Sequence, residues 1–296
     1  MATLKGQNFR IIYGSGVIGM ATNCTVTLGT TTESASTKDV VGIAAKPTII
    51  SKNWQVQVES LYIQDISTFL SAIKTGSLFD LLWDETSTSD NVQPQSATFA
   101  RHGKAYLTDA TINFNDRENS TKSLQFTGSG EIEAVTGVPT ISVPTQAYTK
   151  GQFVRLFLGS DNSAVPSKVI AAAKQLSFHV SATVENSSTK DTDGDWVVNE
   201  VTEVSYDITT NALMRSGETI TSTVLGQDIA SIEEIYETSL PVKFQIANVS
   251  GANQRTKGTV ILSGSVILTQ LVMNGPNRQN ADYTATLTGV GEYGFS

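Results

Sequence analysis

The feature that most constrains this chain is an internal duplication. Short segments of the first half recur in the second half. Their order is kept, while their spacing drifts by loop-sized insertions, which is typical of a duplicated domain. The matched pairs are Lys5-Gly6-Gln7 with Lys150-Gly151-Gln152, Ser36-Thr37-Lys38-Asp39 with Ser188-Thr189-Lys190-Asp191, Asp65-Ile66 with Asp228-Ile229, and Thr127-Gly128-Ser129-Gly130-Glu131 with Thr288-Gly289-Val290-Gly291-Glu292. The sequence therefore predicts two copies of one domain.

An uncharged segment separates the two copies. Residues 138–149 contain two prolines, Pro139 and Pro144, which disfavour helix and hold the chain extended. We therefore expect a first domain at 1–137, an extended linker at 138–149 and a second domain at 150–296.

Hydrophobic periodicity predicts strands almost throughout, in a chain that is rich in Thr and Ser and only 16% charged. Trp54 to Val58 alternates apolar and polar residues, as a half-buried strand does. Residues 65–76 form the clearest helix, with an apolar stripe at i, i+3, i+4 and i+7 and Gly76 as its stop. The predicted fold is mainly β: two tandem antiparallel β-sandwich or open-barrel domains, each with one short flanking α-helix.

The expected strands follow one plan in both copies. In the first copy they are 9–13, 23–28, 54–58, 78–83, 103–108, 110–114 and 123–127. In the second they are near 153–158, 174–184, 196–209, 240–247, 257–263, 265–273 and 282–289, with a helix over 228–237 whose stripe is Ile229, Ile232, Ile235 and Tyr236. Residues 30–52 are expected to form a long polar connection, which in a compact domain usually reaches a partner.

Residue types that carry chemistry are scarce and scattered. His102 and His179 lie in different copies outside any metal-binding spacing, and Cys24, the single cysteine, sits in an alternating strand where an inert thiol is expected. Gly14 to Gly19 spells a dinucleotide-binding pattern but precedes a strand, so it predicts a hairpin turn. Asp191 to Asp195 matches a calcium loop poorly and favours an acidic hairpin tip. We expect no enzyme activity, no cofactor and no catalytic or metal site.

The formal net charge of −8 and the lack of a basic run argue against a surface that binds DNA tightly. The first ten residues, MATLKGQNFR, contain no apolar stretch that would act as a signal peptide, so we expect folding in a cytoplasm and no membrane insertion.

The first copy resembles the major tail tube proteins of long-tailed bacteriophages over residues 1–135. The resemblance is carried by Lys5-Gly6, the Ser36–Asp39 loop, the Trp54 strand, the Asp65-Ile66 helix, Gly103-Lys-Ala-Tyr-Leu-Thr-Asp109 and the Thr127–Glu131 end. The second copy is similar but more divergent, with 204–208 and 258–262 in place of the tryptophan strand and the Ala-Tyr-Leu segment.

This resemblance implies a structural virion protein. Each domain would supply a four-stranded inner face to a ring of six domains, so three chains would form a homotrimeric ring with pseudo-six-fold symmetry. Such rings stack head to tail into a conduit through which viral DNA passes without specific binding. The resemblance also implies a tape-measure protein and tail tip or terminator proteins as partners, synthesis in the host bacterial cytoplasm, and Ser36, Thr37, Lys38, Asp39, Ser188, Thr189, Lys190 and Asp191 as inter-ring contacts.

Two other readings stay open at the level of sequence. A related protein forms a single tail-completion or baseplate ring, and only copy number or polymerisation distinguishes it from a repeating tube. A surface carbohydrate-binding pair of β-sandwiches belongs to another class, and glycan binding would favour it. A contractile tail or a secretion-system tube is also compatible with this sequence, since a sheath would be another chain.

Overall fold

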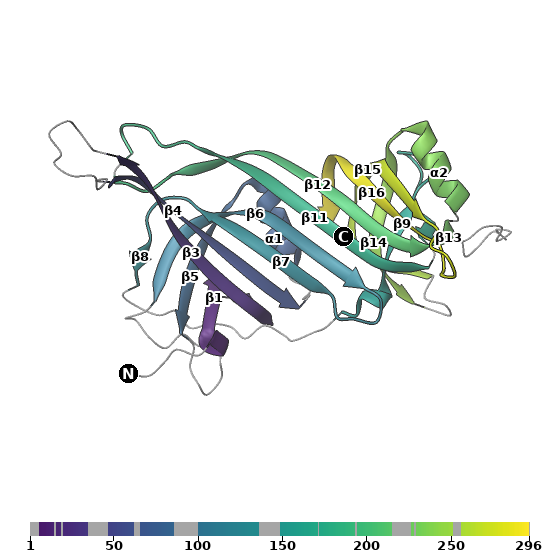
Figure 1. Ribbon diagram of the computed structural model, residues 1–296, viewed down its shortest axis with the longest axis horizontal. Helices are drawn as coiled ribbons and strands as arrows, with labels where there is room; N and C mark the ends of the chain where they lie inside the picture. Colours follow the sequence, from purple (N-terminus) through teal and green to yellow (C-terminus); the bar gives the residue numbers. More distant parts are fainter. Residues whose placement is uncertain are drawn as a thin grey trace.

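The computed structural model describes residues 6–14, 16–18, 20–34, 47–61, 66–85, 100–135, 149–170, 172–192, 194–214, 226–227, 229–250 and 256–295. These residues form a mainly β protein in which nearly all strands pair antiparallel and two short α-helices lie beside the sheet (Figure 1). Within this part of the chain, no helix is long and apolar enough to span a membrane.

The described residues of the first half form eight strands in one arrangement. Their order across the sheet is β2-β1-β5-β6-β7-β4-β3, with the two-residue β8 beside β6. A short 3-10 turn, η1 (Gly6–Asn8), precedes β1, and α1 (Ile66–Thr75) joins β4 to β5. The strands are β1 (Phe9–Tyr13), β2 (Gly16–Val17), β3 (Ala21–Ser34), β4 (Pro47–Leu61), β5 (Leu78–Glu85), β6 (Arg101–Asn115), β7 (Thr121–Gly128) and β8 (Glu133–Ala134).

The second half repeats that arrangement. Its strand order is β10-β9-β14-β15-β16-β12-β11, with β13 beside β10, and α2 (Ile229–Thr238) lies between β12 and β14 in the sequence. The elements are η2 (Gly151–Phe153), β9 (Val154–Leu158), β10 (Lys168–Ile170), β11 (Ala173–Asn186), β12 (Asn199–Leu213), β13 (Gly226–Gln227), β14 (Val242–Ser250), β15 (Thr256–Asn274) and β16 (Asp282–Phe295). The duplication read from the sequence therefore has a duplicated topology, while the exact domain boundaries stay a prediction.

One buried aromatic ring in each half packs closely against two glycines. Trp54 is 1% exposed, and a Cβ on Gly128 would lie 2.1 Å from its ring. In the second half Tyr206 takes the place of Trp54, and a Cβ on Gly289 would lie 2.5 Å from that ring. A Cβ on Gly103 would lie 2.6 Å from another atom of the Trp54 ring, and a Cβ on Gly264 would lie 3.0 Å from the Tyr206 hydroxyl oxygen. The glycines are thus required by close packing, since any side chain would overlap the aromatic ring.

Gly128→Ala tests this packing. Because the added methyl overlaps the Trp54 ring, we expect the free energy of unfolding to fall by about 1–3 kcal/mol or more. Gly6→Ala is the matched control, since its Cβ would meet no atom within 4 Å. Urea unfolding of the two variants makes the comparison. Equal stability of Gly128→Ala and the unmodified chain would contradict the packing account.

Strand breaks expected from the sequence are β-bulges instead. The predicted strands 103–108 and 110–114 are one strand, β6, with a register shift between Leu107 and Asp109, and 257–263 and 265–273 are likewise one strand, β15. In β15 the register shifts between Ser263 and Ser265, at the expected break, and again between Leu268 and Gln270. Thr108 and Thr269, which are skipped at equivalent shifts in the two halves, each donate to a carbonyl oxygen of the neighbouring strand 3.2 Å away. Bulges keep a strand continuous while leaving one residue unpaired, which removes the alternation that sequence reading relies on.

These bulges correct the alignment of the two copies. Thr108 and Thr269 are 161 residues apart, as are Gly128 and Gly289. Gly103-Lys-Ala-Tyr-Leu-Thr108 therefore corresponds to Gly264-Ser-Val-Ile-Leu-Thr269, and the expected match with 258–262 is wrong.

The expected polar connection over 30–52 is also partly wrong. β3 continues to Ser34 and β4 starts at Pro47, so the two strands form a long hairpin. Thr favours strands because it is β-branched, but a two-sided polar strand shows no period of two. This hairpin and the β11–β12 hairpin run side by side toward the same end of the molecule (Figure 1).

The helices match the prediction in extent. Ile66, Phe69, Leu70 and Ile73 of α1 are buried as expected, and Gly76 has the left-handed φ of 59° at the stop. Asp65, Asp228 and nearly all of the expected linker lie outside the described residues. In α2, Ile232 and Ile235 are buried, but Tyr236, which was expected in the apolar stripe, is 48% exposed.

Candidate assembly interface

The two halves join through one pair of antiparallel strands. The second half of β6 pairs with β11, from Asp109 opposite Ser181 to Asn115 opposite Gln175. The first half of β6 uses the same edge to pair with β5, because β7 occupies the other edge. We call the β6–β11 pairing the internal junction. Through this junction, eight neighbouring strands of the 16-stranded sheet follow one another in the order β3-β4-β7-β6-β11-β12-β16-β15. We call these eight strands the eight-strand sheet.

The internal junction is apolar on one face. Ile112 lies opposite Phe178 and Ala110 lies opposite Val180, and all four side chains are 0% exposed. Ring contacts to Tyr206, Phe244 and Tyr293 continue this packing from Phe178 into the second half. The two halves therefore share one hydrophobic core across their boundary.

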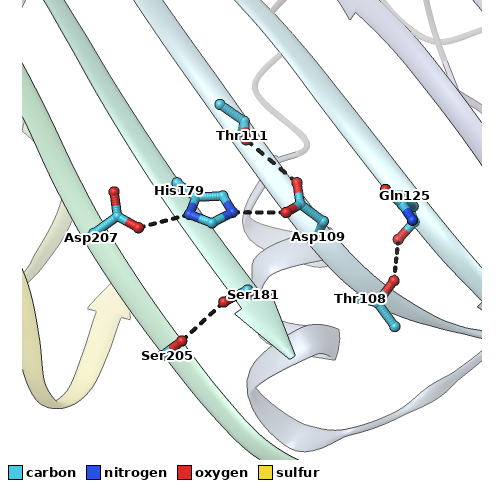
Figure 2. A network of polar contacts seen from close by, with 8 residues as sticks. All are labelled: Thr108, Asp109, Thr111, Gln125, His179, Ser181, Ser205 and Asp207. Atoms are coloured by element: carbon cyan, nitrogen blue, oxygen red, sulfur yellow. Dashed lines mark hydrogen bonds and ion pairs between the residues drawn. The ribbon is translucent and has the colours of Figure 1, made fainter. Parts of the chain in front are cut away.

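The other face of the internal junction carries an ionic cluster. His179 of β11 lies between Asp109 of β6 and Asp207 of β12, and each ring nitrogen is 2.7 Å from a carboxylate oxygen (Figure 2). Only the protonated imidazole can donate from both nitrogens at once. The two carboxylate hydrogen bonds raise the pKa of His179 to about 10. We call these three residues the His179 cluster, and it ties the two halves together.

The His179 cluster predicts a pH-dependent stability. The pKa of His179 is raised above its ordinary value of 6.5, so this stabilisation is fully present below about pH 6.5 and is lost as the pH rises toward 10. We expect His179→Gln to lower the free energy of unfolding by about 1–3 kcal/mol at pH 6 and by much less at pH 10. Urea titrations at both pH values measure the difference in the free energy of unfolding between His179→Gln and the unmodified chain. A difference of the same size at pH 6 and pH 10 would contradict the charged form of His179.

Further contacts join the halves at both ends of the internal junction. At one end Gly151 of η2 sits against the β6–β7 turn, where its N–H donates to Glu118 O at 2.9 Å. A Cβ on Gly151 would lie 2.3 Å from Asn115 O. At the other end, Asn199 Nδ2 donates to Gly128 O at 2.7 Å, and Lys52 forms an ion pair with Asp195 at 3.2 Å.

The ends of the eight-strand sheet are open edges. Among the described residues, β3 pairs only with β4, so its other edge is unoccupied. β15 pairs with β14 up to Val266, and along the rest of that edge, through Asn274, no strand of the described residues pairs with it. Open edges of this length promote pairing with another chain.

Apolar side chains are exposed along both open edges. On β3, Leu28 is 65% exposed. On β15, Val272 is 41% and Met273 is 47% exposed. Exposed apolar residues gathered on open strands are typical of an interface rather than of a free surface.

The face that carries the His179 cluster is polar across the sheet. One row of laterally paired residues runs through six strands as Glu59, Ser123, Thr111, His179, Asp207 and Thr288. A second row consists of Gln57, Gln125, Asp109, Ser181 and Ser205. Apart from the protonated imidazole of His179, hydroxyl, amide and carboxylate groups fill both rows, and neither contains Lys or Arg. These two rows are thus mainly neutral, and their charged groups are Glu59, Asp109, Asp207 and the imidazolium of His179.

The sequence-predicted contact loops fall into two groups. Ser36, Thr37, Lys38 and Asp39 lie outside the described residues. Ser188, Thr189, Lys190 and Asp191 form the exposed tip of the β11–β12 hairpin, which its own side chains hold: Val198 N–H donates to Ser188 Oγ at 2.9 Å. Their role as inter-ring contacts stays a prediction.

Other candidates from the sequence have structural roles. His102 pairs with Asp80 at 2.7 Å. Burial raises the pKa of the Cys24 thiol. Gly14 lies in the turn between β1 and β2, as expected. The described residues include no group of His, Cys, Asp and Glu arranged to hold a metal ion. Sequence reading missed the His179 cluster because its members come from three strands and no local spacing links them.

Comparisons with known proteins concern the fold. No protein-family model matches the sequence, and no curated protein matches it. The chain is similar to solved structures of the tail of the empty gene transfer agent particle, with 15% identity over 49% of this chain and 95% of that one and a TM-score of 0.36. It is also similar to the virion of the native gene transfer agent particle (14%, 50% and 98%, TM-score 0.36) and to the SPP1 tail tube (13%, 49% and 78%, TM-score 0.34).

Proposed function

We propose that this chain is the structural subunit of a bacteriophage tail tube, in which copies join edge to edge into rings and the rings stack into a conduit for viral DNA. The observation that carries the proposal is the eight-strand sheet with its two open edges, which resemble the two edges already joined inside the chain. The sequence resemblance of residues 1–135 to tail tube proteins supports the same function.

Ring closure removes the exposed edges. A closed barrel leaves no strand unpaired, and a contact between different edges of identical chains closes into a ring when the rotation permits. In a homotrimer, three times eight strands give 24 strands, which at a spacing of about 4.8 Å and a tilt of roughly 35–45° form a barrel about 45–50 Å across its backbone. With side chains inside, the channel is still wider than a DNA double helix.

The polar face would line this channel. Its hydroxyl and amide groups would be solvated. The carboxylates of Glu59, Asp109 and Asp207 outnumber the imidazolium of His179, so a passing duplex is not held as it would be by Lys or Arg. The protein would thus be a component of the virion. Tape-measure and tail tip or terminator proteins are the partners that such a tube requires.

Sedimentation velocity of the purified chain over a range of concentrations tests the proposal. We expect a species at three times the 31.6 kDa chain mass, followed by larger stacked assemblies as the concentration rises. A ring that never stacks at any concentration would favour a single-layer tail protein. A monomer at every concentration would contradict self-assembly by the purified chain.

A further inference from the structure

We propose that β3 of one copy pairs antiparallel with Gln270–Asn274 of β15 in a second copy, in the register of the internal junction, and that Gly6 of the first copy seats against the β15–β16 turn of the second. This inference rests on the proposed function and specifies which atoms meet. It treats the contact within the chain as the template for the contact between chains.

The template is defined because the two halves match residue by residue. β3 and β11 have register shifts at the same places, between Ala21 and Asn23 and between Ala173 and Gln175, which lie 152 residues apart. β6 and β15 are matched by the bulges at Thr108 and Thr269. Replacing each strand of the internal junction by its counterpart gives the register between copies. Val26 then lies opposite Met273, and Leu28 lies opposite Leu271.

The exposure of side chains agrees with this register. Met273 is 47% exposed, whereas its counterpart Ile112 is 0% exposed inside the internal junction. Leu28 is 65% exposed, and its counterpart Val180 is 0% exposed. Each of these apolar side chains would be covered by the copy that the register brings. Burying such apolar side chains stabilises the contact between copies.

The polar face of the proposed contact lacks the ionic cluster. Thr27, Gln270 and Gln55 correspond to His179, Asp109 and Asp207. The edges that meet between copies therefore carry hydroxyl and amide groups, which hydrogen-bond without a charge. The chain uses its ionic cluster only where the two halves are covalently connected.

The duplicated Lys-Gly-Gln motif explains the second part of the proposal. Gly151 is buried against Asn115 and Glu118 of the β6–β7 turn. Its counterpart Gly6 is exposed, and a Cβ there would meet no atom within 4 Å. Among the residues that the structure describes, nothing packs closely enough against Gly6 to require a glycine. Close packing against a second copy would require a glycine at this position.

The β15–β16 turn has the shape that this contact needs. Arg117 and Arg278 occupy equivalent positions in the two turns, with φ of 62° and 61°. A hollow of about 590 Å³ lies beside the turn, lined in part by Leu213, Pro276 and Gln279. Pro276 and Gln279 correspond to Asn115 and Glu118, two residues of the first half that contact Gly151. We therefore assign this hollow to Gly6 of a second copy.

Disulfide trapping tests the register. In a Cys24→Ser background the chain has no other thiol, so Val26→Cys with Met273→Cys reports only the proposed contact. Directly opposed residues lie about 4.5–5.5 Å apart at Cα, within disulfide range. We expect oxidation to link most chains covalently, with a ladder that stops at the number of copies in a ring. Val26→Cys with Leu271→Cys is the control, because that pair lies two residues out of register, about 7–8 Å apart.

The outcomes separate the two proposals. Assembled particles that do not link at Val26 and Met273, or that link equally well in the control, would overturn the register and leave the tube intact. A chain that stays monomeric at every concentration would overturn both. Gly6→Val is a second probe: we expect an unchanged melting temperature for the single chain and an at least tenfold higher concentration for assembly. Unchanged assembly by this variant would overturn the seating of Gly6.

Discussion

Placing two lysines on the open edge of β3, as Val26→Lys with Leu28→Lys, is expected to abolish assembly while the single chain stays folded. Leu28 is 65% exposed in the chain alone, so a lysine there costs little. In the proposed contact between copies it takes the position of Val180, which is 0% exposed. An unpaired charge buried there costs about 3–5 kcal/mol, which is more than a hundredfold in affinity for each contact.

Sedimentation velocity measures whether the variant assembles, and a thermal melt measures whether the single chain stays folded. Val165→Lys is the matched control, because Val165 is 73% exposed in the loop between β9 and β10, away from both open edges. We expect this control to assemble as the unmodified chain does. Assembly of the double lysine variant at the usual concentration would show that the β3 edge is not an interface.

Exchanging the charges at the tip of the β11–β12 hairpin is expected to leave rings that do not stack. Lys190→Glu with Asp191→Lys keeps the net charge at −8 and alters two exposed side chains far along the hairpin from the internal junction. If the tip contacts the neighbouring ring, opposite charges that attract there become like charges that repel. The same exchange at Lys38 and Asp39, the sequence counterparts, should add to the effect.

Electron microscopy of these variants separates ring formation from stacking. Glu234→Lys, on an exposed position of α2, is the control for a charge change elsewhere. We expect long assemblies from the control and mostly single rings from the exchanged tips. Tubes of normal length from the exchanged variants would remove both hairpin tips from the inter-ring contact.

Much of the fold was predictable because periodicity and duplication are local in sequence. The stripe of α1, the alternation around Trp54 and the turn at Gly14 each follow from a few consecutive residues. Strand continuity through the register shifts near Thr108 and Gly264 was not predictable, because a bulge interrupts the alternation without ending the strand. The hairpin of β3 and β4 was underestimated because Thr-rich strands that are polar on both faces resemble loops.

The assembly interface was only half visible in the sequence. The repeated Lys-Gly-Gln motif pointed to a feature used twice, but not to what it contacts. The His179 cluster and the open edge of β15 arise from strands far apart in the chain, and single-sequence patterns carry no information on such pairings. The counterparts Ile112 and Met273 become informative only when their burial is compared.

The most direct test of the account is electron microscopy of the assembled chain viewed end-on. The account predicts closed rings with three-fold averages that look six-fold, around a channel of about 35–40 Å once side chains are placed inside a 24-strand barrel. Each ring should be one unbroken sheet, with β3 beside β15 at every contact between copies. Two-lobed monomers at all concentrations, or rings whose copies meet through other surfaces, would contradict it.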